Sequence, residues 1–116
     1  MTTYRLRNAR TGAVVADAVG RAGNPISRGV GLLGRKAVAP GEGLWIGGCN
    51  AVHTLGMRAT IDLVFLDRDG RVLKIETGVA PGRLAVSCRG AKTVVELGAG
   101  SRAGSDVAVG DRLSLE

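Results

Sequence analysis

Apolar and polar residues alternate over short stretches of this chain, a pattern typical of strands. Residues 4–8 read Tyr-Arg-Leu-Arg-Asn, and an apolar stretch resumes at Val14 after the Thr11-Gly12 pair. A period of two residues places alternate side chains on opposite faces of a strand. The opening of the chain therefore predicts two strands joined by a turn, a β-hairpin.

The clearest hairpin signal lies in the middle of the chain. Residues 61–66, Ile-Asp-Leu-Val-Phe-Leu, and residues 71–76, Arg-Val-Leu-Lys-Ile-Glu, flank the tetrapeptide Asp-Arg-Asp-Gly at 67–70. This tetrapeptide favours a turn, because its last residue adopts positive φ easily. The first strand is apolar almost throughout, so we expect it to be central in a sheet. In the second strand, Leu73 and Ile75 are expected to share one face.

Shorter apolar stretches predict the remaining elements. Strands are expected over residues 44–46, 51–54, 84–88, 93–97 and 112–115, with 84–88 at a sheet edge. Thr93, Val95 and Leu97 should share the inner face of their strand. One brief helix is expected over 27–33, capped by Ser27 and stopped by Gly34. Eight or so short strands with one or two short helices predict a mostly β domain, either a small barrel-like fold or a sandwich.

Composition places this pattern in a single domain. The chain has 116 residues, 45% of them hydrophobic and 22% charged, which is ordinary for a globular protein that buries one core. Nineteen glycines imply many tight turns and suit short strands better than long helices. No repeat or linker is visible, so residues 1–116 are predicted to form one domain.

The sequence predicts a soluble, cytoplasmic protein. Its amino terminus lacks the apolar run of a signal peptide. The longest stretch without a formal charge, residues 43–57, is too short and too polar to span a membrane. In that setting Cys49 and Cys88 are expected to be reduced thiols rather than a structural disulfide.

Positive charge is concentrated in the first third of the chain. The net charge is +6, and residues 1–40 carry seven Arg or Lys against Asp17 alone. A basic surface attracts acidic proteins, nucleic acid or an anionic membrane surface, although a solvated arginine-rich face is the simpler interpretation. The partners considered from the sequence are an acidic protein and a small ligand. Tyr4, Trp45 and Phe65 are the only aromatic residues, which leaves little for base stacking and disfavours nucleic acid.

Cys49 and His53 are the residues that could form a nucleophile and its base, with Asp62 orienting the histidine. Residues four apart on a strand lie about 13 Å apart, so a turn over 47–50 would have to bring them together. The favoured alternative is a buried thiol and a structurally satisfied histidine. No complete catalytic motif is present, and the sequence does not decide whether the protein is an enzyme.

Metal binding would use Cys49, His53 and Cys88, with Asp62 as a further ligand. A thiolate and imidazole set suits zinc. However, the chain has a single histidine and no Cys-x-x-Cys pair, so we predict neither a metal nor another cofactor. A redox couple of the two cysteines is possible, without the spacing of a thioredoxin motif.

Several short motifs, taken in order, resemble the bacterial and archaeal family called domain of unknown function 192, or uncharacterised protein family 127. The motifs are Arg28, 31–33, Arg35, 41–44, 53–58, 61–62, 65–67, 70–72, 94–97, Gly100 and 110–113. The resemblance implies a small β-rich fold and no known activity. Many members have Trp-Met-Lys-Asn-Thr and a proline before the aspartate, where this chain has His53-Thr-Leu-Gly-Met and Thr60. It looks like a cytosolic variant without the secretion or anchor segment of many relatives.

The leading hypothesis from the sequence is a binding or accessory module of unknown ligand. Its site would lie around Trp45, Cys49, His53, Arg58 and Asp62, where Gly, Cys, His, Trp and Arg gather beside a plain hairpin. One alternative is a Cys/His-dependent or metal-assisted hydrolase. Another is weak binding of nucleic acid or an acidic partner through the basic amino-terminal part.

Overall fold

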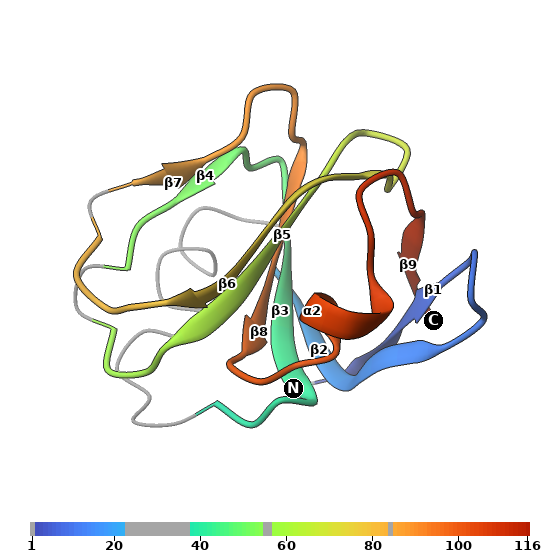
Figure 1. Cartoon of the computed structure of the whole chain (residues 1–116), viewed down its shortest axis with the longest axis horizontal. Helices are drawn as coiled ribbons and strands as arrows, with labels where there is room; N and C mark the ends of the chain where they lie inside the picture. The colour runs from blue at the N-terminus through green and yellow to red at the C-terminus, as the bar shows by residue number, and fades with distance from the viewer. Residues whose placement is uncertain (1, 23–37, 55–56, 84) are drawn as a thin grey trace.

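The computed structural model describes residues 2–22, 38–54, 57–83 and 85–116, which form nine strands and one short helix (Figure 1). The elements are β1 (Tyr4–Asn8), β2 (Val14–Ala22), β3 (Glu42–Gly47), β4 (Ala51–Val52), β5 (Ile61–Leu66), β6 (Val72–Val79), β7 (Val86–Ser87), β8 (Thr93–Gly98), α2 (Ala103–Asp106) and β9 (Leu113–Leu115). The predicted mostly β class is confirmed. The helix expected over 27–33 lies outside the described residues.

Seven strands form one mixed sheet in the order β6-β5-β8-β3-β2-β1-β9. β2 and β3 pair in parallel, and the other neighbours pair antiparallel. The sheet is open rather than a closed barrel. Among the described residues, the edges at β6 and β9 approach each other through an isolated backbone bridge between Arg71 and Arg112.

Both predicted hairpins are confirmed. β1 pairs with β2 and β5 pairs with β6, each pair antiparallel. The turns rely on Gly12 and Gly70, which have φ of 73° and 83°. These values lie in the left-handed region that glycine adopts without steric cost. The apolar strand β5 is buried along its whole length between β6 and β8, as expected of an interior strand.

The expected pairing of Leu73 with Ile75 on one face of β6 is wrong. Leu66 lies opposite Val72 and Phe65 lies opposite Lys74, so Leu73 is an extra residue in the ladder. Such a β-bulge shifts the alternation by one position. Val72 and Ile75 therefore pack on the same side, whereas Leu73 is 37% exposed.

Two main core clusters cover opposite faces of the sheet. The first contains, among others, Leu6, Val15, Val19, Val64, Leu66, Val95, Leu97, Ala103 and Leu113. The second contains, among others, Val38, Met57, Ile61, Leu63, Phe65, Val79, Val86 and Val94. Val95 and Leu97 of β8 share a face as predicted, while Val94 on the other face is fully buried too. β8 is thus covered on both faces.

β4 and β7 form a separate two-stranded sheet beside the main one (Figure 1). The strand expected over 84–88 is only two residues long, and it pairs with β4 rather than with the main sheet edge. Val86 packs into the second cluster. Lys74 lies 5.5 Å over the Phe65 ring and donates to the Ser87 carbonyl at 3.0 Å. These contacts hold the small sheet against the second-cluster face.

Candidate functional site

Asp62 points toward the helix α2 side of the sheet. Its carboxylate accepts hydrogen bonds from the Gly78 amide at 2.8 Å, the Ser101 hydroxyl at 2.7 Å and the Ser101 amide at 3.2 Å. The residue is 2% exposed. Its chain neighbours Ile61 and Leu63 belong to the second cluster, so the alternation of β5 directs Asp62 to the first-cluster face.

Cys49 lies on the other side of the sheet. It is half-buried against the second cluster, and its thiol donates to the Ala51 carbonyl at 2.9 Å. His53 follows β4 and is exposed. The structure therefore separates Asp62 from Cys49, so these residues do not assemble as a nucleophile, a base and an orienting carboxylate.

Trp45 and Arg58 are also apart. Trp45 packs half-buried against the first cluster from β3, opposite Val95. Arg58 is exposed between Met57 and Ala59, which belong to the second cluster. The five residues expected to share one site thus divide between two faces of the sheet and the surface.

The weak metal candidates do not form a ligand set. In the part of the chain that the structure describes, no group of three or more His, Cys, Asp or Glu residues could hold a metal ion. Cys88 and Cys49 are both half-buried against the second cluster, and both thiols are free. The two cysteines thus pack against the same cluster, without the additional ligands among the described residues that a zinc site needs.

Glu96 is a chemically unusual residue that the sequence analysis did not single out. It lies in β8 opposite Leu44 and Leu63 and is only 7% exposed. This burial raises the pKa of its carboxyl to about 7, because removal from water disfavours the charged form. The glutamate inside the apolar stretch 93–97 is the signal in the sequence, and the predicted inner face of Thr93, Val95 and Leu97 leaves it on the opposite face.

A hollow of about 400 Å³ lies where the two sheet edges meet. Its lining comes from three separate turns and comprises Ala9, Arg10, Arg71, Gly110, Asp111 and Arg112. Arg10 belongs to the β1–β2 turn, Arg71 ends the β5–β6 turn, and Arg112 precedes β9. The bridge between Arg71 and Arg112 holds two of these segments together. We call this feature the arginine hollow.

Asp111 fixes one arginine of the hollow. Its carboxylate accepts from Arg10 Nε at 2.5 Å and Nη2 at 3.0 Å, from Asn8 Nδ2 at 2.9 Å and from the Ala108 amide at 2.8 Å. The hydrogen bond from Arg10, with help from Asn8 and Ala108, holds the pKa of this carboxyl well below its usual range. Asp111 is 5% exposed in its side chain, whereas Arg10 is 58% exposed. The buried acid thus orients an exposed guanidinium.

The charge balance of the arginine hollow is positive. Its lining carries three arginines and one aspartate, a formal sum of +2. A second hollow of about 370 Å³, between β2 and Arg102, is lined by one arginine and one aspartate. Guanidinium groups bind carboxylates and phosphates through paired hydrogen bonds. Of the two, the arginine hollow is therefore the one suited to an anion.

The fold and this site define a small mostly β domain with an open mixed sheet and a positively charged arginine hollow where the sheet edges meet. The chain belongs to the DUF192 family of uncharacterized proteins, whose sequence pattern matches residues 6–115. The resemblance noted in the sequence is thus confirmed.

Two solved structures are similar in fold. A chain from Sinorhizobium meliloti 1021, described as "a putative transcription regulator", has a TM-score of 0.81 and 26% identity, covering 99% of this chain and 97% of its own. A protein of unknown function from Novosphingobium aromaticivorans DSM 12444 has a TM-score of 0.74 and 19% identity, covering 84% of this chain and 74% of its own. No curated protein matches the sequence. No helix among the described residues is long and apolar enough to cross a membrane.

Proposed function

We propose that this domain is a binding module for a small anionic molecule, held in the arginine hollow. The observation that carries the proposal is the convergence of Arg10, Arg71 and Arg112 from three distant turns around one concave surface. This retains the binding-module hypothesis drawn from the sequence and gives it a different location.

The arginine hollow is suited to a compact ligand. Its volume of about 400 Å³ falls within the range of small-molecule sites. Arg10 uses Nε and Nη2 on Asp111, and Arg71 donates through Nη1 to the Gly110 carbonyl at 3.3 Å. A guanidinium has five N–H donors, so both groups retain donors beyond these contacts. Donors held in place beforehand bind an anion with a smaller loss of side-chain entropy.

Nucleic acid is the less favoured anion. The Sinorhizobium meliloti chain, which is 26% identical, is described as "a putative transcription regulator". Nucleic acid is therefore retained as an alternative ligand. Binding of single-stranded nucleic acid draws on exposed aromatic rings, yet Trp45 packs against the first cluster and Phe65 is fully buried. A small phosphate or carboxylate can be bound by the guanidinium groups without any exposed aromatic ring.

The hydrolase alternative has less support. It requires a thiol activated by a nearby base, and His53 is exposed beyond β4 while Asp62 is hydrogen-bonded on the opposite face from Cys49.

Titration of the isotope-labelled protein with inorganic phosphate, and separately with citrate, tests the proposal by NMR. We expect chemical-shift changes at the amides of residues 9–10, 71 and 110–112. Arg71→Gln and Arg112→Gln should each weaken binding roughly tenfold, the loss expected for a charge-assisted hydrogen bond. Arg58→Gln, at an exposed arginine elsewhere, is the matched control and should bind as the wild type does.

Two outcomes would overturn the proposal. Shifts that are absent at millimolar anion, or that weaken equally in the Arg58 variant, would show unspecific charge attraction only. Tighter binding of a single-stranded oligonucleotide than of either small anion, with a steep dependence on salt, would favour nucleic acid instead.

A further inference from the structure

The two cysteines of the chain lie on neighbouring backbone segments. Ala51 pairs with Ser87 and Val52 with Val86 in the β4–β7 sheet. The Cys88 amide donates to the Asn50 carbonyl at 3.0 Å, which extends this pairing by one position. Cys49 is therefore one residue from the position directly opposite Cys88. The Cys49 amide donates to the Lys92 carbonyl at 3.0 Å, within the turn that follows Cys88.

Both side chains point toward the same core. In a regular ladder, residues offset by one position would point to opposite faces. Here Gly48 has φ of 67° and the chain bends at Asn50, and both cysteines pack against the second cluster. Directly opposite residues on paired strands have Cα atoms about 4.5–5.5 Å apart, and an offset of one residue adds a rise of about 3.4 Å along the strand. Together these give a separation of about 6 Å, within the range of about 4.4–6.8 Å that a disulfide spans.

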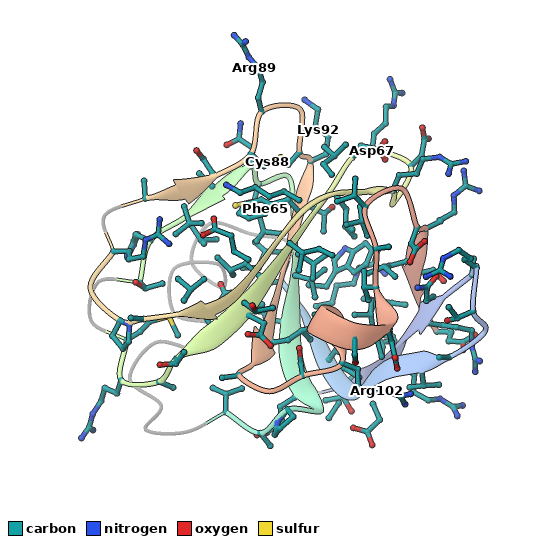
Figure 2. The ribbon with its side chains drawn as sticks, in the orientation of Figure 1. Phe65, Asp67, Cys88, Arg89, Lys92 and Arg102 are labelled. Carbon is teal, nitrogen blue, oxygen red and sulfur yellow. The ribbon has the colours of Figure 1, made fainter. Side chains whose placement is uncertain are left out.

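Both thiols are partly accessible to a reagent. Each cysteine is half-buried rather than enclosed. Besides this packing, each thiol donates a hydrogen bond, from Cys49 Sγ to the Ala51 carbonyl at 2.9 Å and from Cys88 Sγ to the Arg89 carbonyl at 3.6 Å. Figure 2 shows Cys88 at the base of the turn from which Arg89 and Lys92 project. Rotation of the two side chains would replace weak hydrogen bonds by a covalent bond.

We propose that Cys49 and Cys88 form a reversible intramolecular disulfide by exchange with a low-molecular-weight disulfide such as oxidised glutathione. One cysteine thiolate attacks the glutathione disulfide, forming a mixed disulfide and releasing one reduced glutathione. The thiolate of the second cysteine then attacks the protein sulfur of the mixed disulfide and releases the second reduced glutathione. The protein loses two protons and two electrons, and the two glutathione sulfurs gain the electrons.

The disulfide would join the turn after β3 to the turn before β8. These turns frame the small β4–β7 sheet, which is attached to the main sheet through Val86 and Lys74. A bond between residues 49 and 88 closes a long loop of chain and restricts the unfolded state. The oxidised protein should therefore unfold at higher temperature than the reduced protein.

Equilibration of the native protein in glutathione redox buffers, followed by acid quenching and intact mass measurement, tests this inference. We expect a product lighter than the reduced protein by two hydrogen atoms, reversed by dithiothreitol. A peptide map without reduction should show residues 49 and 88 joined. Cys49→Ser and Cys88→Ser should instead each retain one bound glutathione, because the resolving thiol is missing.

Attachment of two glutathiones to the wild-type protein would overturn the inference, since it shows that the thiols do not reach one another. Disulfide-linked dimers as the main product, or thiols that stay reduced in oxidised glutathione alone, would overturn it as well. A second measurement, the reduction potential of the native protein, should be the same at two protein concentrations if the bond is intramolecular.

Discussion

Arg71 and Arg112 face each other across a backbone bridge that joins the two edges of the seven-stranded sheet. Flanking hydrogen bonds extend the contact, from the Val72 amide to the Asp111 carbonyl at 2.8 Å and from the Leu113 amide to the Gly70 carbonyl at 2.9 Å. The same segments carry the arginines of the proposed anion site. The distance between the backbone positions of Arg71 and Arg112 is therefore fixed by main-chain hydrogen bonds rather than by their flexible side chains.

Replacement of Gly70 by alanine should disrupt the backbone contact between the two edges of the sheet. A Cβ atom at Gly70 would lie 2.7 Å from the Leu113 carbonyl oxygen, in a residue with φ of 83°. We expect a loss of about 2–4 kcal/mol in the free energy of unfolding from the steric overlap and the backbone strain together. Gly12→Ala, with φ of 73° and nothing within 4 Å, carries the strain alone and should cost about 1–2 kcal/mol. Urea unfolding of both variants checks this, and equal losses would contradict it.

Asp111→Asn should make the protein less stable and less sensitive to acid. The variant loses the charge-assisted bonds to Arg10 and weakens those from Asn8 and the Ala108 amide. We expect a cost of about 1–3 kcal/mol at neutral pH. In the wild type the lowered pKa of this carboxyl stabilises the fold above the unfolded value of about 3.9, and this contribution is lost as the pH falls. Thermal unfolding between pH 7 and 3 should show a smaller decline in the variant.

Glu96→Gln should raise stability at high pH. The pKa of Glu96 is about 7 in the folded protein and 4.5 without burial, so the protonated form is favoured in the fold. Its contribution is fully present below pH 4.5 and is lost as the pH rises through 7, at most about 3 kcal/mol. Denaturant unfolding at pH 5 and pH 8.5 should show a narrower difference for Glu96→Gln than for the wild type.

A matched control for Glu96 is Glu76, in the exposed part of β6. The hydrogen bond from Lys74 lowers the pKa of the Glu76 carboxyl, the opposite direction. Glu76→Gln weakens two partly exposed ion pairs, with Lys74 and with Arg83, each of 3.1 Å, and should cost no more than about 1 kcal/mol. A pH profile that flattens equally in both variants would contradict the assignment to Glu96.

Asp62→Ala and His53→Ala should differ strongly in stability. Removal of the Asp62 carboxylate leaves the Gly78 amide and the amide and hydroxyl of Ser101 without their acceptor, which should cost about 2–4 kcal/mol. His53 is exposed, so its replacement should change the free energy of unfolding by less than about 0.5 kcal/mol. Circular dichroism during thermal unfolding distinguishes them. Similar losses would show that His53 has a structural role as well.

The local features of the fold were predictable from the sequence. Turn residues at Gly12 and Gly70 identify both hairpins, and the apolar stretch of β5 identifies an interior strand. These signals act over a few residues, where turn geometry and alternation fix the conformation. The alternation of apolar and polar residues did not predict the bulge at Leu73. The bulge depends on the register with β5, which the β6 sequence alone does not encode.

The candidate sites depend on long-range pairing and were harder to predict. Cys49, His53 and Asp62 are close in sequence, yet the alternation of β5 and the departure of β4 into a second sheet separate them. Conversely, Arg10, Arg71 and Arg112 are distant in sequence and meet only because the sheet edges meet. The basic amino-terminal part supplies one of these three arginines, so charge counting located only a fraction of the site.

The pairing of the first strand with the last has a consequence for how the protein folds. Leu6 lies opposite Leu115, and Arg5 and Glu116 exchange both backbone hydrogen bonds. During synthesis, β1 therefore lacks its outer neighbour until residues 113–115 have left the ribosome. Contacts between residues so distant in sequence slow folding. Until β9 pairs with it, the exposed edge of β1 promotes aggregation. The yield of folded protein should accordingly depend more on keeping the β1–β2 hairpin from aggregating during synthesis than on how fast any single hairpin forms.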